Sequence, residues 1–261
     1  MLPHERQSEI LKMLYETRSV KISQLTKSFD VSRETIRKDL YDMEEQGLIQ
    51  KVHGGAILSK ANHETDYLNR KNINDSEKRC IAKKAADFVS NGDTIYIDYG
   101  TTASYFVNEI LAMEDLTIIT ASLPIAIELS NFTDFEIVLI GGSIRKNEKS
   151  LYGPIAHRVL QNLYVDKGFF GIGGVDPEAG LTNFHMGESD ISKLMIQHSK
   201  MSIMMADYSK FNTVAMNQVA SLDDINVLIT DDKTDLATLK NLETKVENVF
   251  VVTAEGSENV E

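Results

Sequence analysis

Residues 30–56 read DVSRETIRKDLYDMEEQGLIQKVHGGA, and this stretch predicts a capped helix followed by a short hairpin. Ser32 is a favourable N-cap, because its hydroxyl accepts a hydrogen bond from an amide of the first helical turn. Gly47 is a favourable residue after the last turn, because glycine adopts the left-handed conformation without strain. Between these ends one apolar stripe recurs at helical spacing, formed by Ile36, Leu40 and Met43. The opposite face is polar and mostly basic.

The flanking residues predict the elements that such a helix packs against. Two upstream segments with one apolar face each, 3–17 and 23–29, predict two shorter helices. The connection at 29–32 is tight, and a short turn between steeply packed helices distinguishes a helix-turn-helix from a plain helical hairpin. Downstream, Leu48-Ile49-Gln50 and Ala56-Ile57-Leu58 flank His53-Gly54-Gly55, where glycines permit the positive φ of a hairpin turn. Residues 1–58 therefore predict a winged helix-turn-helix domain.

The polar face of the third helix and the wing are the candidate DNA-contacting surface, because this motif places its third helix in the major groove. The candidate residues are Ser32, Arg33, Glu34, Thr35, Arg37, Lys38, Lys51, His53 and Gly54. The alternative is a small helical protein-interaction module whose basic side chains are only solvated.

Charge is divided unevenly along the chain. Residues 1–60 contain 10 Lys+Arg and 9 Asp+Glu, whereas residues 61–261 contain 17 and 30, so the net charges are +1 and −13. A DNA duplex repels the acidic part, and contact with DNA is expected only in the first domain. Because that domain carries few cations, a homo-oligomer, either a dimer or a tetramer, is expected to bind the operator.

Length and composition favour a cytoplasmic protein with one small and one large domain. The 261 residues are 42% hydrophobic, which suffices for a core of ordinary size. No apolar run has the length of a membrane span, and the first residues lack the basic-then-apolar layout of a secretion signal. Cys80 is the only cysteine, so an internal disulfide is excluded.

From residue 76 onward the sequence alternates between strand and helix patterns. The predicted strands are Thr94–Asp98, Leu116–Thr120, Glu136–Ile140, Lys167–Ile172, Met201–Ala206, Asn226–Thr230 and Asn248–Val252. Nearly continuous apolar strands are typical of sheets buried on both faces, and amphipathic segments of crossover length separate most of them. Residues 76–253 therefore predict a doubly wound, mainly parallel α/β domain. Residues 59–75 predict a linker, and 254–261 an acidic tail.

The carboxyl ends of parallel strands form the usual ligand-binding edge of such a sheet. The run Asp98-Tyr99-Gly100-Thr101-Thr102 leaves the first strand and enters a helix, whose amides and hydroxyls can hold an anion such as phosphate. Small residues and a few charged residues also follow the other predicted strands. The candidate effector-binding residues are Asp98, Gly100, Thr101, Thr102, Ser122, Gly141, Gly142, Arg145, Gly173, Asp176, Thr182, Asp207 and Lys210. Arg145 and Lys210 are the candidate cations, and the three aspartates are candidate acceptors for sugar hydroxyls.

The segments VSRETIRKDL and GLIQKVHGGA, followed by the strand-end motifs in order, resemble the DeoR family of bacterial transcription regulators. The resemblance implies a repressor of a sugar operon, with a C-terminal sensor domain similar in fold to ribose-5-phosphate isomerase. Its effector would be a phosphorylated sugar or a related metabolite. Ala121 departs from the family, which often has Asn there, and Asn183-Phe184-His185-Met186 is an unusual continuation that leaves the identity of the effector open.

Enzyme motifs are incomplete in this sequence. Asp176 replaces the last glycine of a dinucleotide fingerprint, and the histidines show no metal-binding spacing. A phosphosugar isomerase-like enzyme with an attached DNA-binding domain is the main alternative. However, Asn183-Phe184-His185 stands where the isomerases carry an Arg-Glu-Lys run with the catalytic base. No catalytic residue, metal or cofactor is therefore expected, and a ligand-free oligomerisation scaffold is the third possibility.

Overall fold

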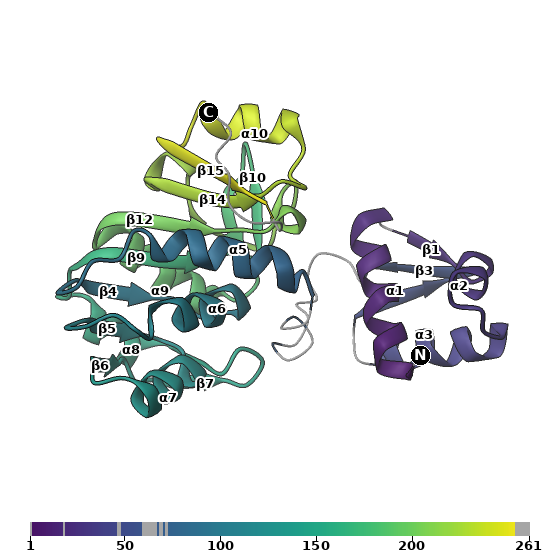
Figure 1. Ribbon diagram of the computed structural model, residues 1–261, viewed down its shortest axis with the longest axis horizontal. Coiled ribbons are helices and arrows are strands. Elements are labelled where there is room, and N and C mark those ends of the chain that lie inside the picture. Colours follow the sequence, from purple (N-terminus) through teal and green to yellow (C-terminus); the bar gives the residue numbers. More distant parts are fainter. Residues whose placement is uncertain are drawn as a thin grey trace. The chain divides into compact units, whose positions relative to one another are not determined.

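The computed structural model describes residues 2–17, 19–45, 48–58, 67, 70 and 73–253. The chain divides into two compact units, Met1–Ile73 and Asn74–Glu261 (Figure 1). The expected acidic tail, 254–261, and most of the expected linker, 59–75, lie outside the described residues.

The N-terminal unit is a winged helix-turn-helix, as the sequence predicts. Its described elements are α1 (Pro3–Thr17), β1 (Ser19–Lys21), α2 (Ile22–Phe29), α3 (Arg33–Glu45), β2 (Ile49–Val52) and β3 (Gly55–Leu58). The apolar stripe of α3 is fully buried against α1 and α2 in one core. Strand β1 pairs antiparallel with β3, so the wing sheet has the order β1-β3-β2. The sequence did not predict β1, because three residues are too few to show an alternating pattern.

Local backbone chemistry explains how α3 begins and how the wing turns. The hydroxyl of Ser32 accepts a hydrogen bond from the amide of Thr35 at 3.1 Å, which confirms the predicted N-cap. In the wing, Gly54 has a φ of +84°, as a hairpin turn requires. Gly55 serves another purpose, because a Cβ at that position would lie 2.0 Å from the carbonyl oxygen of Val20 in β1. The second glycine therefore permits the close approach of β1.

A buried ion pair joins α1 to α3. The Arg6 guanidinium donates from Nε to Oδ2 of Asp39 at 2.6 Å and from Nη2 to Oδ1 at 3.0 Å. The two side chains are only 6% and 4% exposed. This fork-to-carboxylate geometry fixes the rotation of α3 about its own axis, because a bidentate pair tolerates little change in direction. The pair thereby determines which face of α3 remains exposed.

We predict that Asp39→Ala destabilises the N-terminal unit, because it leaves the Arg6 guanidinium buried without its carboxylate. The expected loss is about 3–5 kcal/mol in the free energy of unfolding of that unit. Native-state hydrogen exchange of the amides of α1 and α3, in the full chain, measures this quantity. Asp42→Ala is the matched control, since Asp42 lies on the same helix and makes no ion pair with a described residue. Equal losses of unfolding free energy in both variants would contradict the stabilising role of the Arg6–Asp39 ion pair.

The C-terminal unit is built on a parallel sheet. Its seven strands within residues 73–253 are, in chain order, β4 (Thr94–Ile97), β5 (Thr117–Thr120), β6 (Glu136–Leu139), β9 (Val165–Gly171), β12 (Ser199–Met205), β14 (Val227–Asp231) and β15 (Asn248–Val252). Every pairing between them is parallel. The seven predicted strands are therefore confirmed, each within two residues at either end.

The strand order of this sheet is β15-β14-β12-β9-β4-β5-β6. The chain starts at β4, proceeds through β5 to β6, returns to β9 on the other side of β4, and then continues outward to β15. The direction of winding thus reverses between β4 and β9. In open parallel sheets this reversal separates the two neighbouring loops and creates a crevice at the carboxyl ends of the strands.

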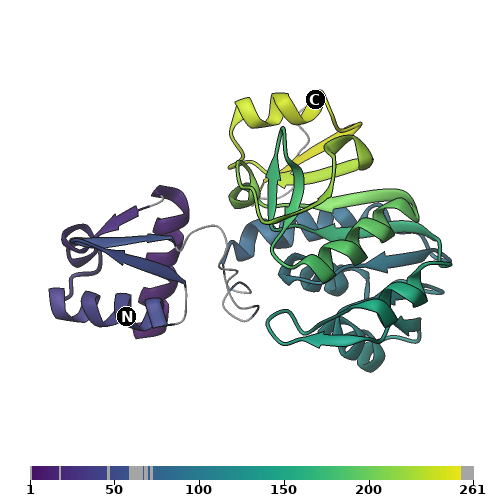
Figure 2. The ribbon, with the colours of Figure 1, turned by 180° about the vertical axis from the view of Figure 1, so that it is seen from behind.

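Helices cover both faces of the sheet, as Figures 1 and 2 show from opposite sides. Helices α5 (Asp75–Ala86), α6 (Thr101–Ile110) and α7 (Leu123–Phe132) share one core with Ile95 and Ile97 of β4. Helices α8 (Pro154–Leu160), α9 (Met186–Gln197) and α10 (Leu236–Glu243) share the other core with Tyr96. Alternate residues of β4 therefore enter opposite layers, and the predicted doubly wound α/β fold is confirmed.

Short antiparallel elements extend the sheet at its carboxyl edge. A hairpin of β7 (Ser143–Arg145) and β8 (Ser150–Tyr152) follows β6. A small sheet in the order β10-β11-β13 follows β9, with bounds Gly174–Asp176, Gly180–Asn183 and Asn217–Ala220. None of the helices in the described residues combines the length and apolar character that a membrane span requires.

Candidate functional site

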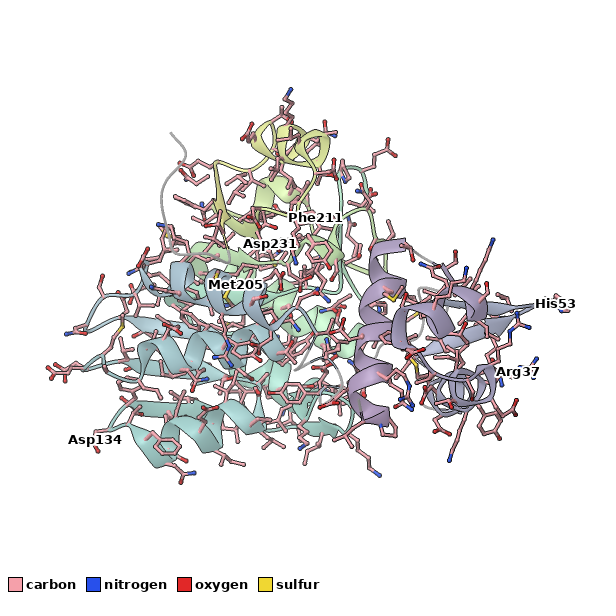
Figure 3. All side chains as sticks on the ribbon, turned by 45° about the vertical axis from the view of Figure 1, so that its right-hand side comes forward. Arg37, His53, Asp134, Met205, Phe211 and Asp231 are labelled. Carbon is pink, nitrogen blue, oxygen red and sulfur yellow. The ribbon has the colours of Figure 1, made fainter. Side chains whose placement is uncertain are left out.

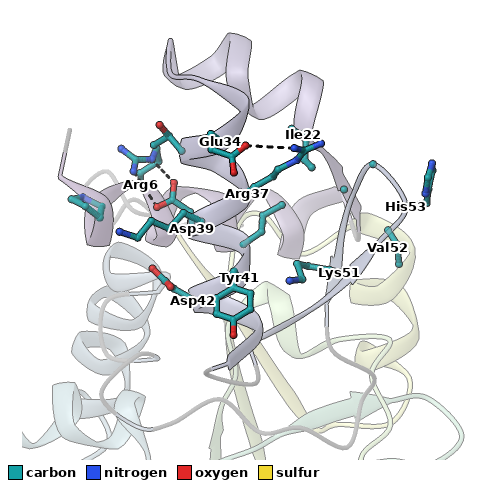
Figure 4. A pocket seen from close by; sticks show the side chains of 16 residues that line it. Arg6, Ile22, Glu34, Arg37, Asp39, Tyr41, Asp42, Lys51, Val52 and His53 are labelled. Atoms are coloured by element: carbon teal, nitrogen blue, oxygen red, sulfur yellow. Dashed lines mark hydrogen bonds and ion pairs between the residues drawn. The ribbon is translucent and has the colours of Figure 1, made fainter.

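The exposed face of α3 and the wing border a groove on the N-terminal unit (Figure 4). Its polar lining includes the candidate residues Glu34, Thr35, Arg37, Lys38, Lys51, His53 and Gly54. Figure 3 shows Arg37 and His53 at the surface of this unit. The elements predicted to contact DNA therefore share one surface.

The basic residues of α3 are available to an external anion. Arg33, Arg37 and Lys38 are exposed. Arg37 Nη1 lies 3.5 Å from Glu34 Oε2, and the two side chains are 62% and 84% exposed. An ion pair this exposed and this long contributes little, so the guanidinium is free to exchange Glu34 for a phosphate or a base edge.

Lys51 and Ser32 have structural partners within the unit, and their expected roles as DNA contacts stay predictions. Lys51 Nζ lies 2.9 Å from Glu44 Oε2 and 4.6 Å from the ring centre of Tyr41, and its backbone amide donates to Glu44 Oε1 at 2.8 Å. Hydrogen bonds from Lys51 lower the pKa of Glu44 below its ordinary value. Lys51 therefore ties the wing to α3, and Ser32 is occupied as the N-cap.

Tyr41 is a surface residue of this groove that the sequence interpretation missed. Its side chain is 53% exposed and lines the groove between α3 and the wing. The signal was present in the sequence, because Tyr41 follows Arg37 by four residues and so lies on the same face of the helix. A half-exposed aromatic ring beside basic residues offers a flat apolar contact for a sugar or a thymine methyl group.

At the switch point of the C-terminal unit, the loop after β4 forms an open helix N-terminus. Gly100 occupies the N-cap of α6 with a φ of +111° and supplies no side-chain cap, so the first-turn amides remain open. Thr101 and Thr102 are 5% and 8% exposed. Their hydroxyls make no hydrogen bond with any residue that the structure describes. This combination of amides, hydroxyls and a helix dipole suits an anion.

Asp98 lies beneath this loop and is fully buried. Oδ1 accepts from the Tyr96 hydroxyl at 3.1 Å, and Oδ2 accepts from the Ser192 hydroxyl at 2.9 Å. Burial raises the pKa of Asp98 to about 7, although these donors oppose the shift. Both oxygens have donors, so Asp98 supports the loop from below, and its expected role as an acceptor for a ligand hydroxyl stays a prediction.

Asp207 and Lys210 follow β12 on the same edge. Asp207 caps the short helix η1 (Tyr208–Lys210) by accepting from the Ser209 amide at 3.0 Å. Its Oδ1 also accepts from Asn74 Nδ2 at 2.9 Å, whereas its Oδ2 is buried and has no partner among the described residues. Lys210 is half-buried and makes no ion pair with a described residue. These two residues therefore retain binding capacity.

Other candidates have structural roles within the protein, and their expected roles in binding an effector stay predictions. Arg145 pairs with Glu188, which is 1% exposed and also accepts from Ser150. This pair pins the β7–β8 hairpin to α9, so Arg145 does not present a free cation. Ser122 caps α7, and Gly142 is required because a Cβ there would lie 2.6 Å from the Tyr152 carbonyl oxygen.

The small antiparallel sheet accounts for two further candidates. Asp176 accepts from the amides of Glu178 and Ala179, both at 2.9 Å, and so closes the β10–β11 turn. Thr182 Oγ1 donates to the Gly174 carbonyl at 3.2 Å and accepts from the Ala215 amide at 2.9 Å. Both side chains thus have backbone partners, and their expected roles in binding an effector stay predictions.

The unusual Asn183-Phe184-His185 segment reaches the switch point. Asn183 Nδ2 donates to the Tyr99 hydroxyl at 2.6 Å. A Cβ on Gly173 would lie 2.8 Å from the ring of Phe184, so a glycine is needed for this close approach. His185 caps α9 by accepting from the Glu188 amide at 3.3 Å. The segment therefore packs against the loops that follow β4 and β9, while Gly141, with a φ of +70°, faces open space.

Helix α5 supplies polar residues to this edge that the sequence interpretation missed. Asn74, Glu77 and Lys78 are 8%, 3% and 3% exposed. Glu77 pairs with Lys233, which follows β14. A polar residue at the buried start of a helix was the available signal, but the partner elements lie more than 130 residues away. Only the folded sheet brings them together.

Comparisons with known proteins cover both units. A family model described as the DeoR-like helix-turn-helix domain matches residues 6–62, and one described as the DeoR C terminal sensor domain matches residues 73–232. Among solved structures, ribose 5-phosphate isomerase from Plasmodium falciparum aligns with 53% of this chain and 54% of that chain, at 20% identity and a TM-score of 0.40. That similarity carries no argument about activity.

Curated relatives match over nearly their whole length. An uncharacterized HTH-type transcriptional regulator of Bacillus subtilis, YulB, is 37% identical over 97% of this chain and 98% of its own. The HTH-type transcriptional regulator GolR of Listeria innocua is 34% identical over 93% and 96%. The glycerol-3-phosphate regulon repressor of Escherichia coli is 32% identical over 87% and 90%. With a winged helix, a doubly wound sensor unit and these matches, the chain belongs to the DeoR family of helix-turn-helix transcriptional regulators.

Proposed function

We propose that this regulator represses an operon of carbohydrate metabolism and that a small phosphorylated metabolite controls its binding to DNA. The observation that carries the proposal is the open N-terminus of α6, where two nearly buried threonine hydroxyls have no partner among the described residues. The name of one relative, the glycerol-3-phosphate regulon repressor of Escherichia coli, supports the class of operon and of metabolite. The name of another, the transcriptional repressor GlcR of Bacillus subtilis, supports repression.

Electrostatics favours an anionic ligand held by local donors. The part of the chain after residue 60 has a net charge of −13, so long-range attraction does not concentrate a phosphate there. The amides that follow Gly100, the hydroxyls of Thr101 and Thr102, and the ammonium group of Lys210 offer short-range donors. The free oxygen of Asp207 offers an acceptor for a hydroxyl of the same molecule.

Control of DNA binding requires two arrangements of the protein that differ in affinity for the effector. An operator favours one arrangement of the DNA-binding units, within a homo-oligomer, and the effector favours another. The effector changes operator occupancy only by the ratio of its affinities for the two states. Release by the metabolite, which relieves repression, is the direction that we propose.

Catalysis is the alternative that the geometry does not favour. An isomerase needs a carboxylate base with an oxygen open to the substrate. Asp98 has a pKa of about 7, which would suit a base, but donors occupy both of its oxygens. Asn183, near the position of the expected base, donates to Tyr99. A site that binds a ligand without catalysis needs no open carboxylate base, so it is compatible with these contacts of Asp98 and Asn183.

The first prediction of this proposal concerns DNA. Arg37→Ala should weaken binding to an operator selected from a random duplex library by about 1–3 kcal/mol if the guanidinium reads a base. Lys27→Ala is the matched control, because it removes one exposed cation from α2, outside the groove. Fluorescence anisotropy at one fixed salt concentration measures both. Equal weakening by the two substitutions would show that only total charge matters.

The second prediction concerns the effector. Lys210→Ala should raise the concentration of sugar phosphate needed for half-maximal release of the operator by about 10- to 100-fold, through loss of a charged hydrogen bond. A thermal-shift panel that includes glycerol 3-phosphate, glycerol and inorganic phosphate identifies the ligand used. Lys200→Ala is the control, since Lys200 lies at the opposite, amino edge of β12 and pairs with Asp166. If Lys210→Ala leaves the midpoint unchanged, the phosphate lies elsewhere.

The third prediction is that the protein does not exchange a carbon-bound proton of the bound sugar phosphate with solvent deuterium. NMR of a stoichiometric mixture in deuterated water tests this directly. Exchange that disappears in Asp98→Asn would establish the isomerase alternative, because that substitution removes a carboxylate buried beneath the loop.

A further inference from the structure

Asn74 stands at the boundary between the two units along the chain. It is the first residue of the C-terminal unit and directly follows Ile73, the last residue of the N-terminal unit. Its φ is +54°, and it forms the N-cap of α5 without a hydrogen bond from its side chain to the helix. An asparagine at an N-cap ordinarily uses its side chain for the helix amides. Here the side chain is directed to other partners.

Those partners belong to the loop that follows β12. Asn74 Nδ2 donates to Asp207 Oδ1 at 2.9 Å, and Asn74 Oδ1 accepts from the Tyr208 hydroxyl at 3.4 Å. Asn74 is 8% exposed and Asp207 is 1% exposed, so water does not compete freely for these bonds. Residues separated by 133 positions in the sequence are thus directly joined.

The same turn of α5 is joined to α6, the helix whose open N-terminus is the proposed anion site. The Tyr105 hydroxyl in α6 donates to Asp75 Oδ1, and Arg79 Nε donates to Asp75 Oδ2 at 2.8 Å. Two residues at the start of α5 therefore contact α6, at Tyr105, and the loop that follows β12, at Asp207. A change in the separation of α6 and this loop must alter the contacts of Asn74 or Asp75.

The two carboxylate oxygens of Asp207 differ in their hydrogen bonding. Asn74 and Ser209 donate to Oδ1, while Oδ2 is buried without a partner among the described residues. Burial raises the pKa of Asp207, but the charges of Lys210 and Lys78, with the bonds from Ser209 and Asn74, outweigh it and lower the pKa. The carboxylate is therefore charged, and a hydroxyl of a ligand would satisfy its remaining oxygen.

We propose that Asn74 is a positioning residue that orients the Asp207 carboxylate for the effector and couples its occupancy to the boundary between the units. The inference rests on the proposed function and names the residue through which the site acts. A ligand hydroxyl on Oδ2 moves or repolarises the carboxylate, which changes the bond to Asn74. Because Asn74 is the residue at which the sensor unit begins, the backbone leading to the DNA-binding unit experiences that change.

Two substitutions separate this role from simple helix capping. Asn74→Gly removes the amide but retains the freedom for a positive φ, and Asn74→Asp retains a capping side chain but faces Asp207 with a like charge. Asp115→Gly is the matched control, because Asp115 has a φ of +58° and is exposed before β5, at the opposite edge of the sheet.

The main measurement is the ratio of operator affinities without and with saturating glycerol 3-phosphate, or with the panel compound that gives the largest thermal shift in the wild type. Both Asn74 variants should still saturate with the compound, at an affinity lowered less than about tenfold, while the ratio falls to within about twofold of 1. Asp115→Gly should keep the wild-type ratio. Asn74 variants that saturate and keep the wild-type ratio would overturn the inference.

A second measurement needs no effector and therefore distinguishes failure of this inference from failure of the proposed function. Without ligand, Asn74→Gly in the full chain should increase amide hydrogen exchange in residues 207–211 by about tenfold, with no change there in Asp115→Gly. A helix cap alone would affect only residues 74–80. If no phosphate compound alters operator binding by the wild type, the proposed function fails. Unchanged exchange in 207–211 overturns the coupling role of Asn74 in either case.

Discussion

Parallel strands cannot be joined by tight turns, and this constraint organises the whole sensor unit. Each strand of the main sheet must be followed by a crossover that returns the chain to the starting edge, so the carboxyl ends of all seven described strands gather on one edge. The reversal between β4 and β9 then opens that edge at one place. The loop that presents Gly100 lies there because of the strand order, whatever residues occupy the neighbouring loops.

Most of the polar residues named at this edge make contacts within the protein that hold the edge together. The pairs Arg145–Glu188 and Asn183–Tyr99 hold the short antiparallel elements against the helices and loops, and Asp98 is buried beneath the first loop. Binding capacity remains where a donor or acceptor lacks an internal partner, at the start of α6 and at Asp207 and Lys210. The proposed effector site is therefore smaller than the set of polar residues at the strand ends.

In the DNA-binding unit, too, several charged residues pair within the protein. Arg6 of α1 pairs with Asp39 of α3, and Lys51 of the wing pairs with Glu44. The basic residues left exposed are those at the start and middle of α3. A protein with a net charge of −12 thereby presents a basic face locally. Its two units meet in sequence at Ile73 and Asn74, and the second of these residues is hydrogen-bonded to the edge of the sensor sheet.

The sequence by itself determined the winged helix, the seven strands and the loop at Gly100, because caps, turns and buried apolar runs act over a few residues. Ser32 finds its partner three positions away, and β15 agrees with its predicted bounds. Tertiary structure alone decided which polar residues remain open. Arg145 and Glu188 are 43 positions apart, and Asn74 and Asp207 are 133 apart. Such partners depend on strand order and crossover packing, which no local pattern encodes, so the contacts of Arg145 and Asn74 emerged only from the fold.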